Sequence, residues 1–317
     1  MGASQLRFVV ATADGDIRAE AREHVNAEAG PAGVIAQLRN GISRLTQESN
    51  RQPGGLQGIA IGVPGGVDPQ TGKVIDANNV PGWREVDMGR ELEEAFRAPV
   101  YLDNDANMAA IGEHWRGVAQ GVDNFVFIAL GTGIGSGIFA NGRICRGRSG
   151  FAGELFRMNL DWTRWNDDFP DTGYLEAHVS GVALATEGRK IFTPGNGSAA
   201  STLAQSRDAR YVFDALRQGN PPALALVEKS FCMLGVAVAN VISVLDPELI
   251  VFNGGIVKGA PDLLLETVDK VVRRIHPKPP RIQLSTLGEK AQIWGALHTL
   301  LDPAQQDAIR ARSVSSQ

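Results

Sequence analysis

Hydrophobic and polar residues at the start of the chain follow two periods, one typical of strands and one typical of helices. Two strand-like runs, 6–11 and 17–25, flank the step Asp14-Gly15, which favours a tight turn between antiparallel strands. Across 31–47, apolar residues recur every three or four positions, as they do on the buried face of a helix. The chain is therefore predicted to open with a β-hairpin that packs against a helix.

The alternation of strand-like and helix-like periods continues to the C-terminal region. Strands are predicted at 56–63, 73–77, 100–102, 125–130, 249–252 and 281–284. Helices are predicted at 89–96, 106–116, 222–245, 261–274 and from residue 290. Segment 192–210 is rich in small residues and 276–280 holds three prolines, so both are expected to be surface connections. This order predicts an α/β fold with mixed sheets flanked by helices.

Length, charge and cysteine content narrow the class of protein. A chain of 317 residues predicts about two domains, and a net charge of -4 offers no field that attracts nucleic acid. Cys145 and Cys232 are the two cysteines and cannot build a disulfide framework. The most apolar stretch, 233–245, falls short of the roughly 20 residues that span a membrane. With no secretory signal visible, we expect a cytoplasmic protein without membrane or nucleic-acid partners.

A glycine-rich turn follows the predicted strand 125–130. In 131–137 every second residue is glycine, and such a turn exposes successive backbone N–H groups that hold phosphates. The spacing fits neither the dinucleotide fingerprint nor the Walker A motif. A tight hairpin turn without a ligand is the alternative, but the four alternating glycines favour a phosphate site.

Segment 101–107 places two aspartates and two asparagines where a strand gives way to a helix. Either Asn104 or Asp105 is suited to capping that helix, and capping alone would explain the segment. Phosphoryl transfer, however, needs a carboxylate that accepts the proton of the attacking hydroxyl. Beside a phosphate-binding turn, Asp105 is the candidate base.

Two further features add to this picture. Glu154 and Glu176 each follow shortly after a glycine, and paired carboxylates can bind neighbouring hydroxyls of a sugar, although a single glutamate is by default only solvent-exposed. Segment 246–255 combines a helix end, an apolar strand and a Gly-Gly turn, and ligands of α/β sheets bind beyond the carboxyl ends of strands. The five histidines show no metal-ligand spacing.

Five short segments stand in a recognisable order along the chain. They are Gly-Val-Pro-Gly (62–65), Asn-Val-Pro-Gly-Trp (79–83), Asn-Asp-Ala-Asn (104–107), Leu-Gly-Thr-Gly-Ile-Gly (130–135) and the Asp-Pro to Gly-Gly run (246–255). This order is typical of the ROK family of sugar kinases and repressors, within the actin-like ATPase superfamily, and the chain resembles that family over nearly its whole length. The resemblance implies two actin-like, ribonuclease H-like domains with a cleft between them. Their expected extents are 1–115 and 116–289, with helix 290–303 packing back on the first domain and a tail at 304–317.

The resemblance also implies roles for individual residues. Asp105 is the expected base, accepting the proton of the sugar's primary hydroxyl. The residues implied in sugar binding are Gly65, Asn79, Asn104, Glu154, Arg157 and Glu176. Those implied in ATP binding are Gly2, Ser4, Gly131, Thr132, Gly133, Gly135, Gly254 and Gly255. Mg²⁺ bridging the nucleotide phosphates and a homodimer are implied as well.

The chain departs from the family pattern in three places. The family's first phosphate motif is Asp-x-Gly-Gly-Thr, preceded by a strand. Met1 aligns with the x of this motif, so the motif's aspartate and the strand before it are absent from the given sequence. We therefore expect a misassigned start. The family's Glu-x-Gly-His reads Glu154 to Arg157 here. The family's zinc segment aligns with 167–176, which holds no cysteine. We therefore expect no structural zinc, with Arg157 pairing with Glu154 or Glu176 instead.

These observations predict an ATP-dependent hexose kinase, and segment 79–83 favours a glucose-type substrate. A catalytically weakened sugar-binding or regulatory protein of the same family is the alternative, favoured by the missing aspartate and by the altered Glu-x-Gly-His segment. A repressor that carries a DNA-binding helix-turn-helix is disfavoured because the fold begins at once. An actin-like ATPase without a sugar is disfavoured by the paired glutamates.

Overall fold

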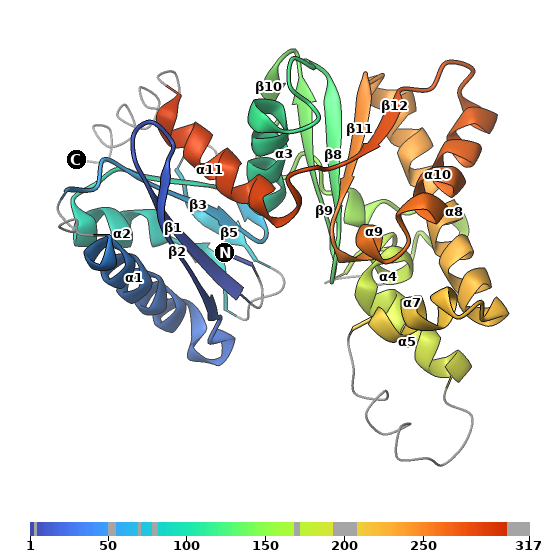
Figure 1. The fold of residues 1–317 in the computed structure, drawn as a ribbon, viewed down its shortest axis with the longest axis horizontal. Helices are drawn as coiled ribbons and strands as arrows, with labels where there is room; N and C mark the ends of the chain where they lie inside the picture. The colour runs from blue at the N-terminus through green and yellow to red at the C-terminus, as the bar shows by residue number, and fades with distance from the viewer. Residues whose placement is uncertain are drawn as a thin grey trace. The chain divides into compact units, whose positions relative to one another are not determined.

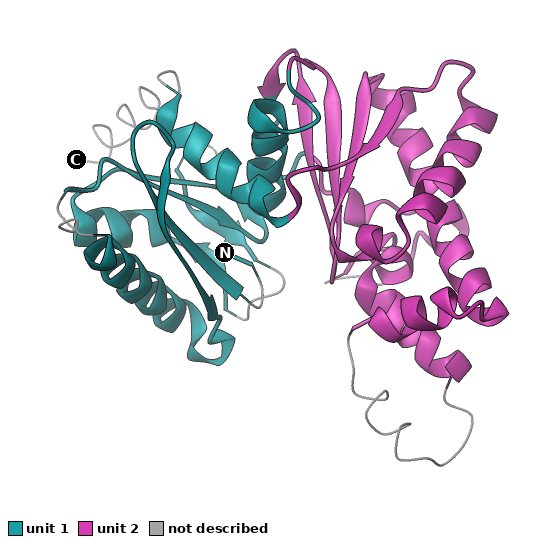
Figure 2. Cartoon of the chain, in the orientation of Figure 1, with its two compact units in different colours: residues 1–120, 144–152, 289–317 teal, residues 121–143, 153–288 magenta. Residues whose placement is uncertain are grey.

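The chain forms two compact units in a computed structural model that describes residues 1–2, 5–49, 55–68, 71–77, 82–167, 172–192 and 208–302. Unit 1 comprises the described residues of Met1–Gln120, Ile144–Ala152 and Glu289–Gln317. Unit 2 comprises those of Gly121–Arg143 and Gly153–Gly288 (Figure 2). Segment 144–152, expected in the second domain, thus packs with unit 1. The last described helix also packs with unit 1, as expected.

Unit 1 contains seven strands and four α-helices in its described part. The strands are β1 (Gln5–Ala11), β2 (Ile17–His24), β3 (Ile59–Val63), β4 (Gly66–Val67), β5 (Val74–Asp76), β6 (Arg84–Val86) and β7 (Val100–Asn104). The helices are α1 (Gly30–Glu48), α2 (Met88–Phe96), α3 (Asp105–Arg116) and α11 (Ala291–Leu301). Short 3-10 turns, η1 (Ala27–Ala29) and η5 (Gly288–Lys290), precede α1 and α11.

The predicted N-terminal hairpin and helix are confirmed. β1 and β2 pair antiparallel, and Gly15 in the turn has a φ of +85°, a conformation that favours glycine. α1 lies against the hairpin so closely that a Cβ at Gly41 would sit 2.4 Å from the ring of Phe8. The apolar face of α1, including Val34 and Leu38, is buried in the core of unit 1 as its period predicts.

In its described part, unit 1 arranges its strands in three small sheets. β1 and β2 form one, β3 and β7 pair parallel in another, and β4, β5 and β6 form an antiparallel third. Among the described residues, no backbone hydrogen-bond ladder joins β1 to β3, so the hairpin and the parallel pair count as separate sheets. The parallel pair sets Val63 beside Asn104, so the carboxyl ends of β3 and β7 lie together.

α11 packs against α3 through glycines, which let two helix backbones approach closely. A Cβ at Gly295 would lie 1.6 Å from the carbonyl oxygen of Met108, and one at Gly112 would lie 2.0 Å from that of Ala291. No other residue type leaves room for this crossing. The helix that begins with Asp105 therefore packs against α11, the last described helix of the chain (Figure 1).

Unit 2 is built on one five-stranded mixed sheet with the strand order β10-β9-β8-β11-β12. The strands are β8 (Phe125–Leu130), β9 (Ile134–Ala140), β10 (Arg143–Ile144), β11 (Leu249–Asn253) and β12 (Arg281–Leu284). The helices are α4 (Glu176–Val179), α5 (Gly181–Phe192), α7 (Arg210–Arg217), α8 (Pro221–Leu245), α9 (Gly255–Gly259) and α10 (Pro261–Ile275), with 3-10 turns η3 (Leu155–Arg157) and η4 (Trp162–Arg164). Figure 1 shows α8 and α10 side by side along the sheet.

The long helix α8 illustrates why unit 2 has a large core. By length and composition alone its 25 residues could cross a membrane, yet 56% of its most apolar 18-residue stretch is buried inside the protein. The buried residues of α8 include Phe231 and Leu234. Such burial is typical of a core helix in a globular protein. α4, α5 and α7 were not predicted, and most of the connection expected at 192–210 lies outside the described residues.

Candidate active site

The carboxyl ends of β3 and β7 bring the predicted residues Gly65, Asn104 and Asp105 together in unit 1. Asn104 is the N-cap of α3, because its side-chain oxygen accepts the N–H groups of Ala106 (2.8 Å) and Asn107 (3.2 Å). Its amide nitrogen donates to the carbonyl oxygen of Gly65 at 3.0 Å. Asn104 therefore caps the helix, and the carboxylate of Asp105 is left available for other chemistry.

Asp105 is the first residue of α3 and is partly buried. β3 passes so close that a Cβ at Gly62 would lie 3.2 Å from the Cα of Asp105. Burial raises the pKa of Asp105 from 3.8 to about 6, with the Met1 amino group and backbone N–H groups acting in the opposite direction. A carboxylate with this pKa is mostly ionised at neutral pH and is a better proton acceptor than an ordinary aspartate.

The predicted ATP-binding residues near the start of β1 are only partly described. The N–H of Gly2 donates to the carbonyl oxygen of Gln5 at 2.8 Å, and the Met1 amino group donates to that of Gly62 at 2.7 Å. Ser4 lies outside the described residues, as does Asn79 from the predicted sugar-binding set.

The two predicted glycine turns of unit 2 lie side by side, because β8 and β11 are parallel neighbours. The first turn closes with the Gly131 N–H on the carbonyl oxygen of Gly133 at 2.9 Å. The second turn begins at Gly254, whose φ is +116° and whose Cβ would lie 2.1 Å from the carbonyl oxygen of Leu130. The predicted residues Thr132, Gly135 and Gly255 complete the two turns. The structure thus groups bare backbone at the carboxyl edge of the sheet, where α/β proteins bind ligands.

Glu176 lies against the first glycine turn. Its Oε2 accepts the N–H of Ile134 at 2.7 Å, and a Cβ at Gly133 would come within 2.4 Å of the same oxygen. Burial raises the pKa of Glu176. One of the two glutamates predicted to bind sugar is therefore also the side chain that holds the glycine turn in place.

Glu154 follows Gly153, whose backbone conformation would be strained in any residue with a side chain. Gly153 has a φ of +89°, and its carbonyl oxygen accepts the hydroxyl of Ser136 on β9. Gly173, with a φ of +65°, packs on the turn after Glu154, since a Cβ there would lie 2.5 Å from the carbonyl oxygen of Phe156. These glycines bring the segments of Glu154 and Glu176 together in unit 2.

Among the described residues, the expected ion pair of Arg157 is absent, which corrects the sequence-based expectation. Arg157 is exposed, and its guanidinium lies 4.9 Å from the ring centre of Phe156. The ion pairs found within the described ranges include none between Arg157 and Glu154 or Glu176. Stacking on the neighbouring ring keeps the guanidinium in contact with water, so the cost of burying a charge is avoided.

The segment that aligns with the family's zinc segment, 167–176, belongs to unit 2. Across the described ranges, no group of three or more His, Cys, Asp or Glu side chains is arranged to hold a metal ion. Part of the aligned segment, 168–171, lies outside those ranges. The expected lack of zinc stays a prediction.

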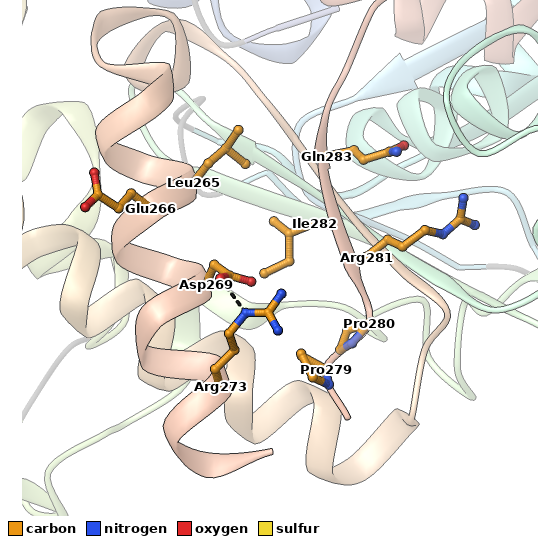
Figure 3. Close-up of a pocket in the computed structure, with 9 residues that line it drawn as sticks. All are labelled: Leu265, Glu266, Asp269, Arg273, Pro279, Pro280, Arg281, Ile282 and Gln283. Carbon is orange, nitrogen blue, oxygen red and sulfur yellow. Dashed lines mark hydrogen bonds and ion pairs between the residues drawn. The ribbon is translucent and has the colours of Figure 1, made fainter. Parts of the chain in front are cut away.

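A shallow pocket of about 600 Å³ lies elsewhere in unit 2, between α10 and the edge strand β12 (Figure 3). Its lining includes the ion pair between Asp269 and Arg273, at 2.6 Å, and the proline pair that precedes β12. None of the predicted site residues lines it.

Comparison with known proteins places this geometry in a family. The ROK family model matches residues 1–302, so the chain belongs to the ROK family. It is 32% identical to a glucokinase from Halalkalibacterium halodurans, over 93% of this chain and 91% of that protein. It is 31% identical to a putative xylose repressor from a Caldicellulosiruptor species, over 77% of this chain and 62% of the repressor.

The fold agrees with solved structures of the same family. A ROK family glucokinase from Streptomyces griseus, in complex with glucose and AMPPNP, superposes with a TM-score of 0.77 at 26% identity. The likeness covers 94% of this chain and 96% of that chain. The chain therefore has the α/β fold with mixed sheets and flanking helices of the actin-like sugar kinases.

Sequence reasoning missed a group of side chains beneath the Asn104–Asp105 segment. Asp103 is 3% exposed and accepts hydrogen bonds from Tyr101, Asn107 and Arg146. Asp103 and Asn107 stood in a segment already singled out, but Arg146 follows 43 residues later. No spacing in the sequence connects Arg146 with that strand end.

Proposed function

We propose that the protein is an ATP-dependent sugar kinase that transfers the γ-phosphoryl group of ATP to a hydroxyl of a hexose, with a glucose-type substrate. The observation that carries the proposal is Asp105, a partly buried carboxylate with a pKa of about 6 at the first turn of α3. Membership of the ROK family and 32% identity to a glucokinase support it.

In the proposed reaction the sugar hydroxyl oxygen forms a bond to the γ-phosphorus while the bond from that phosphorus to the bridging oxygen of ADP breaks. The hydroxyl proton passes to the carboxylate of Asp105, and ADP leaves. Because burial raises the pKa of Asp105 to about 6, the carboxylate is ionised at neutral pH and ready to accept that proton. Asn104 fixes the helix start, so the base is held in one place.

The glycine turns of unit 2 fit a nucleotide's phosphates. Gly131, Gly133 and Gly254 present backbone without side chains, and bare N–H groups are suited to phosphate oxygens. The Streptomyces griseus glucokinase structure with AMPPNP supports this assignment. Mg²⁺, carried on the phosphates, would neutralise charge that develops during transfer.

The sugar side of the proposal rests on Glu154, Glu176, Asn104 and Gly65, with Asn79 and Arg157 as further members. Glu176 uses Oε2 on the Ile134 N–H, which leaves Oε1 for a sugar hydroxyl. A carboxylate that bonds the glycine turn and a sugar at once would link the two substrates within unit 2. The exposed guanidinium of Arg157 would supply donors where the family has a histidine.

The test is an assay of ATP-dependent phosphorylation, with Mg²⁺, over glucose, mannose, allose, fructose and the N-acetylhexosamines. Asp105→Asn should retain sugar binding and lose turnover by at least about 100-fold, because shape persists while the base is gone. Asp87→Asn is the matched control: its side chain accepts the N–H of Arg90 at the start of α2, and an amide oxygen keeps that bond. Turnover close to wild type in Asp105→Asn would refute the assignment of the base.

A sugar-binding regulatory protein is the second candidate, and two observations favour it. Arg157 replaces the histidine of the family's sugar segment, and the chain is 31% identical to a putative xylose repressor. A thermal shift with a hexose, in a protein that phosphorylates none of the panel, would favour this candidate over the kinase.

We further propose that the protein is a cytoplasmic homodimer that binds neither nucleic acid nor membranes. The net charge of -4 and the burial of α8 in its own unit support the last two points. Light scattering coupled to gel filtration tests the oligomeric state.

A further inference from the structure

Arg146 is a charged residue placed inside unit 1 by the short segment 144–152. Its Nε donates to Oδ2 of Asp103 at 2.8 Å, and its terminal nitrogen donates to the hydroxyl of Tyr101. The Arg146 side chain is 22% exposed and that of Asp103 3% exposed, so the ion pair is largely withdrawn from water. Breaking such a pair leaves a buried charge without compensation, and the surroundings must rearrange.

The other oxygen of Asp103 reaches the residues on both sides of Asp105. Oδ1 accepts the backbone N–H of Asn104 and the side-chain amide of Asn107, both at 2.8 Å. Asp105 therefore sits between two residues that one carboxylate holds. The orientation of that carboxylate depends in turn on Arg146 and Tyr101, which bind its second oxygen.

The segment that carries Arg146 has a second anchor in unit 1. The ring of Phe151 lies on Gly66, where a Cβ would come within 2.5 Å of it. The N–H of Ala152 closes the loop on the carbonyl oxygen of Arg146 at 3.2 Å. The loop is thus fixed at one end on β7 and at the other beside Gly65, whose carbonyl oxygen binds Asn104.

We propose that Arg146 is a positioning residue for the base Asp105, acting through Asp103 on Asn104 and Asn107. This inference rests on the proposed function, since it concerns the same proton transfer. The guanidinium fork fits the task because it binds Asp103 and Tyr101 at the same time, whereas the ammonium of a lysine is a point charge. Arg146 itself needs no contact with either substrate.

Arg146→Met tests the proposal with Arg148→Met as the matched control. Arg148 lies in the same loop and is exposed. We expect kcat of Arg146→Met to fall roughly 10- to 100-fold, the size of effect that a misplaced catalytic group produces. The KM for ATP should stay within about twofold, because the loss falls on the chemical step and not on nucleotide binding. Arg146→Lys should recover only part of kcat, and added guanidinium at a non-denaturing concentration should partly rescue Arg146→Met.

Two readouts separate positioning from a merely structural role. The acid limb of the kcat/KM profile should move to higher pH in Arg146→Met, because the unpaired Asp103 anion disfavours a second charge at Asp105. Hydrogen exchange of the peptide that spans 101–110 should become faster than in Arg148→Met. A double variant, Arg146→Met with Asp103→Asn, removes both charges of the ion pair. It allows the measurement even if the single variant unfolds. Its Tm should recover, whereas its kcat should stay low.

The outcomes decide between the hypotheses. A folded Arg146→Met with wild-type kcat, pH profile and exchange would overturn the proposal. A kcat that returns fully in the double variant together with Tm would overturn it as well, since stability alone would then explain the loss. A wild type that phosphorylates no sugar would overturn the proposed function, and with it the catalytic part of this inference, whatever the exchange shows.

Discussion

Replacing Asp105 by asparagine should make the protein more stable at neutral pH while abolishing the proposed reaction. The folded state raises the pKa of Asp105 from 3.8 to about 6, so folding disfavours the ionised carboxylate. When folding raises the pKa of a group, that group does not destabilise the folded state at a pH below its unfolded pKa. The destabilisation grows as the pH rises from about 4 to about 6. The neutral amide of the Asp105→Asn variant would carry no such cost.

The size of the effect follows from the two pKa values. For the rise in the pKa of Asp105 from 3.8 to about 6, linkage gives a cost of about 0.5 kcal/mol at pH 4 and about 3 kcal/mol at pH 8. Since the upper figure assumes the whole shift, we expect a gain of about 1–3 kcal/mol at pH 8, or a rise in Tm of roughly 2–10 °C. At pH 4 the two proteins should melt within about 2 °C of each other.

The assay is thermal unfolding of wild type, Asp105→Asn and Asp87→Asn between pH 4 and pH 8. The control should show no growing difference from wild type, because an amide oxygen keeps the bond to the Arg90 N–H. If Asp105→Asn is no more stable than wild type at pH 8, or if its advantage does not shrink toward pH 4, then Asp105 is not held at an energetic cost. Asp105 would then not be a base whose pKa is raised by burial.

Two substitutions and one elemental analysis probe other parts of the structure. Gly295→Ala should destabilise unit 1 by about 2–4 kcal/mol, because a Cβ would lie 1.6 Å from the Met108 carbonyl oxygen; a Tm unchanged from wild type would contradict the helix crossing. Gly133→Ala should raise the KM for ATP about tenfold with little loss of Tm, because the new methyl group displaces Glu176, 2.4 Å away, from the turn; an unchanged KM would remove the turn from the nucleotide site. Elemental analysis of the purified protein should find no zinc, because 167–176 holds no cysteine; one zinc per chain would overturn that expectation.

Local patterns predicted most elements of the fold. The Asp14-Gly15 step, the 3.6-residue period of α1 and the apolar run of β8 each concern residues close in sequence, and each prediction is confirmed. The start of β9 at Ile134 was harder to predict from the sequence, because Gly135 and Gly137 have low strand propensity. They belong to the strand because they pair with β8. The separate sheets of unit 1 depend on which edges meet, and no local pattern encodes that.

The candidate site divides in the same way. Asn104, Asp105 and the glycine turns could be found because a capping sequence and a run of glycines are visible in the chain. Arg146 could not, since its partner Asp103 lies 43 residues away and only tertiary packing joins them. The bond from Glu176 to the Ile134 N–H, across 42 residues, was hidden for the same reason.

The position of α11 has a consequence for how the protein is made. Unit 2 is encoded mostly by one continuous stretch inside unit 1, so its residues leave the ribosome before α11 does. Domains fold during synthesis once their residues are available, and α3 lacks the helix that packs on Gly112 until residues 291–301 emerge. The nascent chain can therefore complete unit 2 before α11 packs on α3, the helix that begins with Asp105.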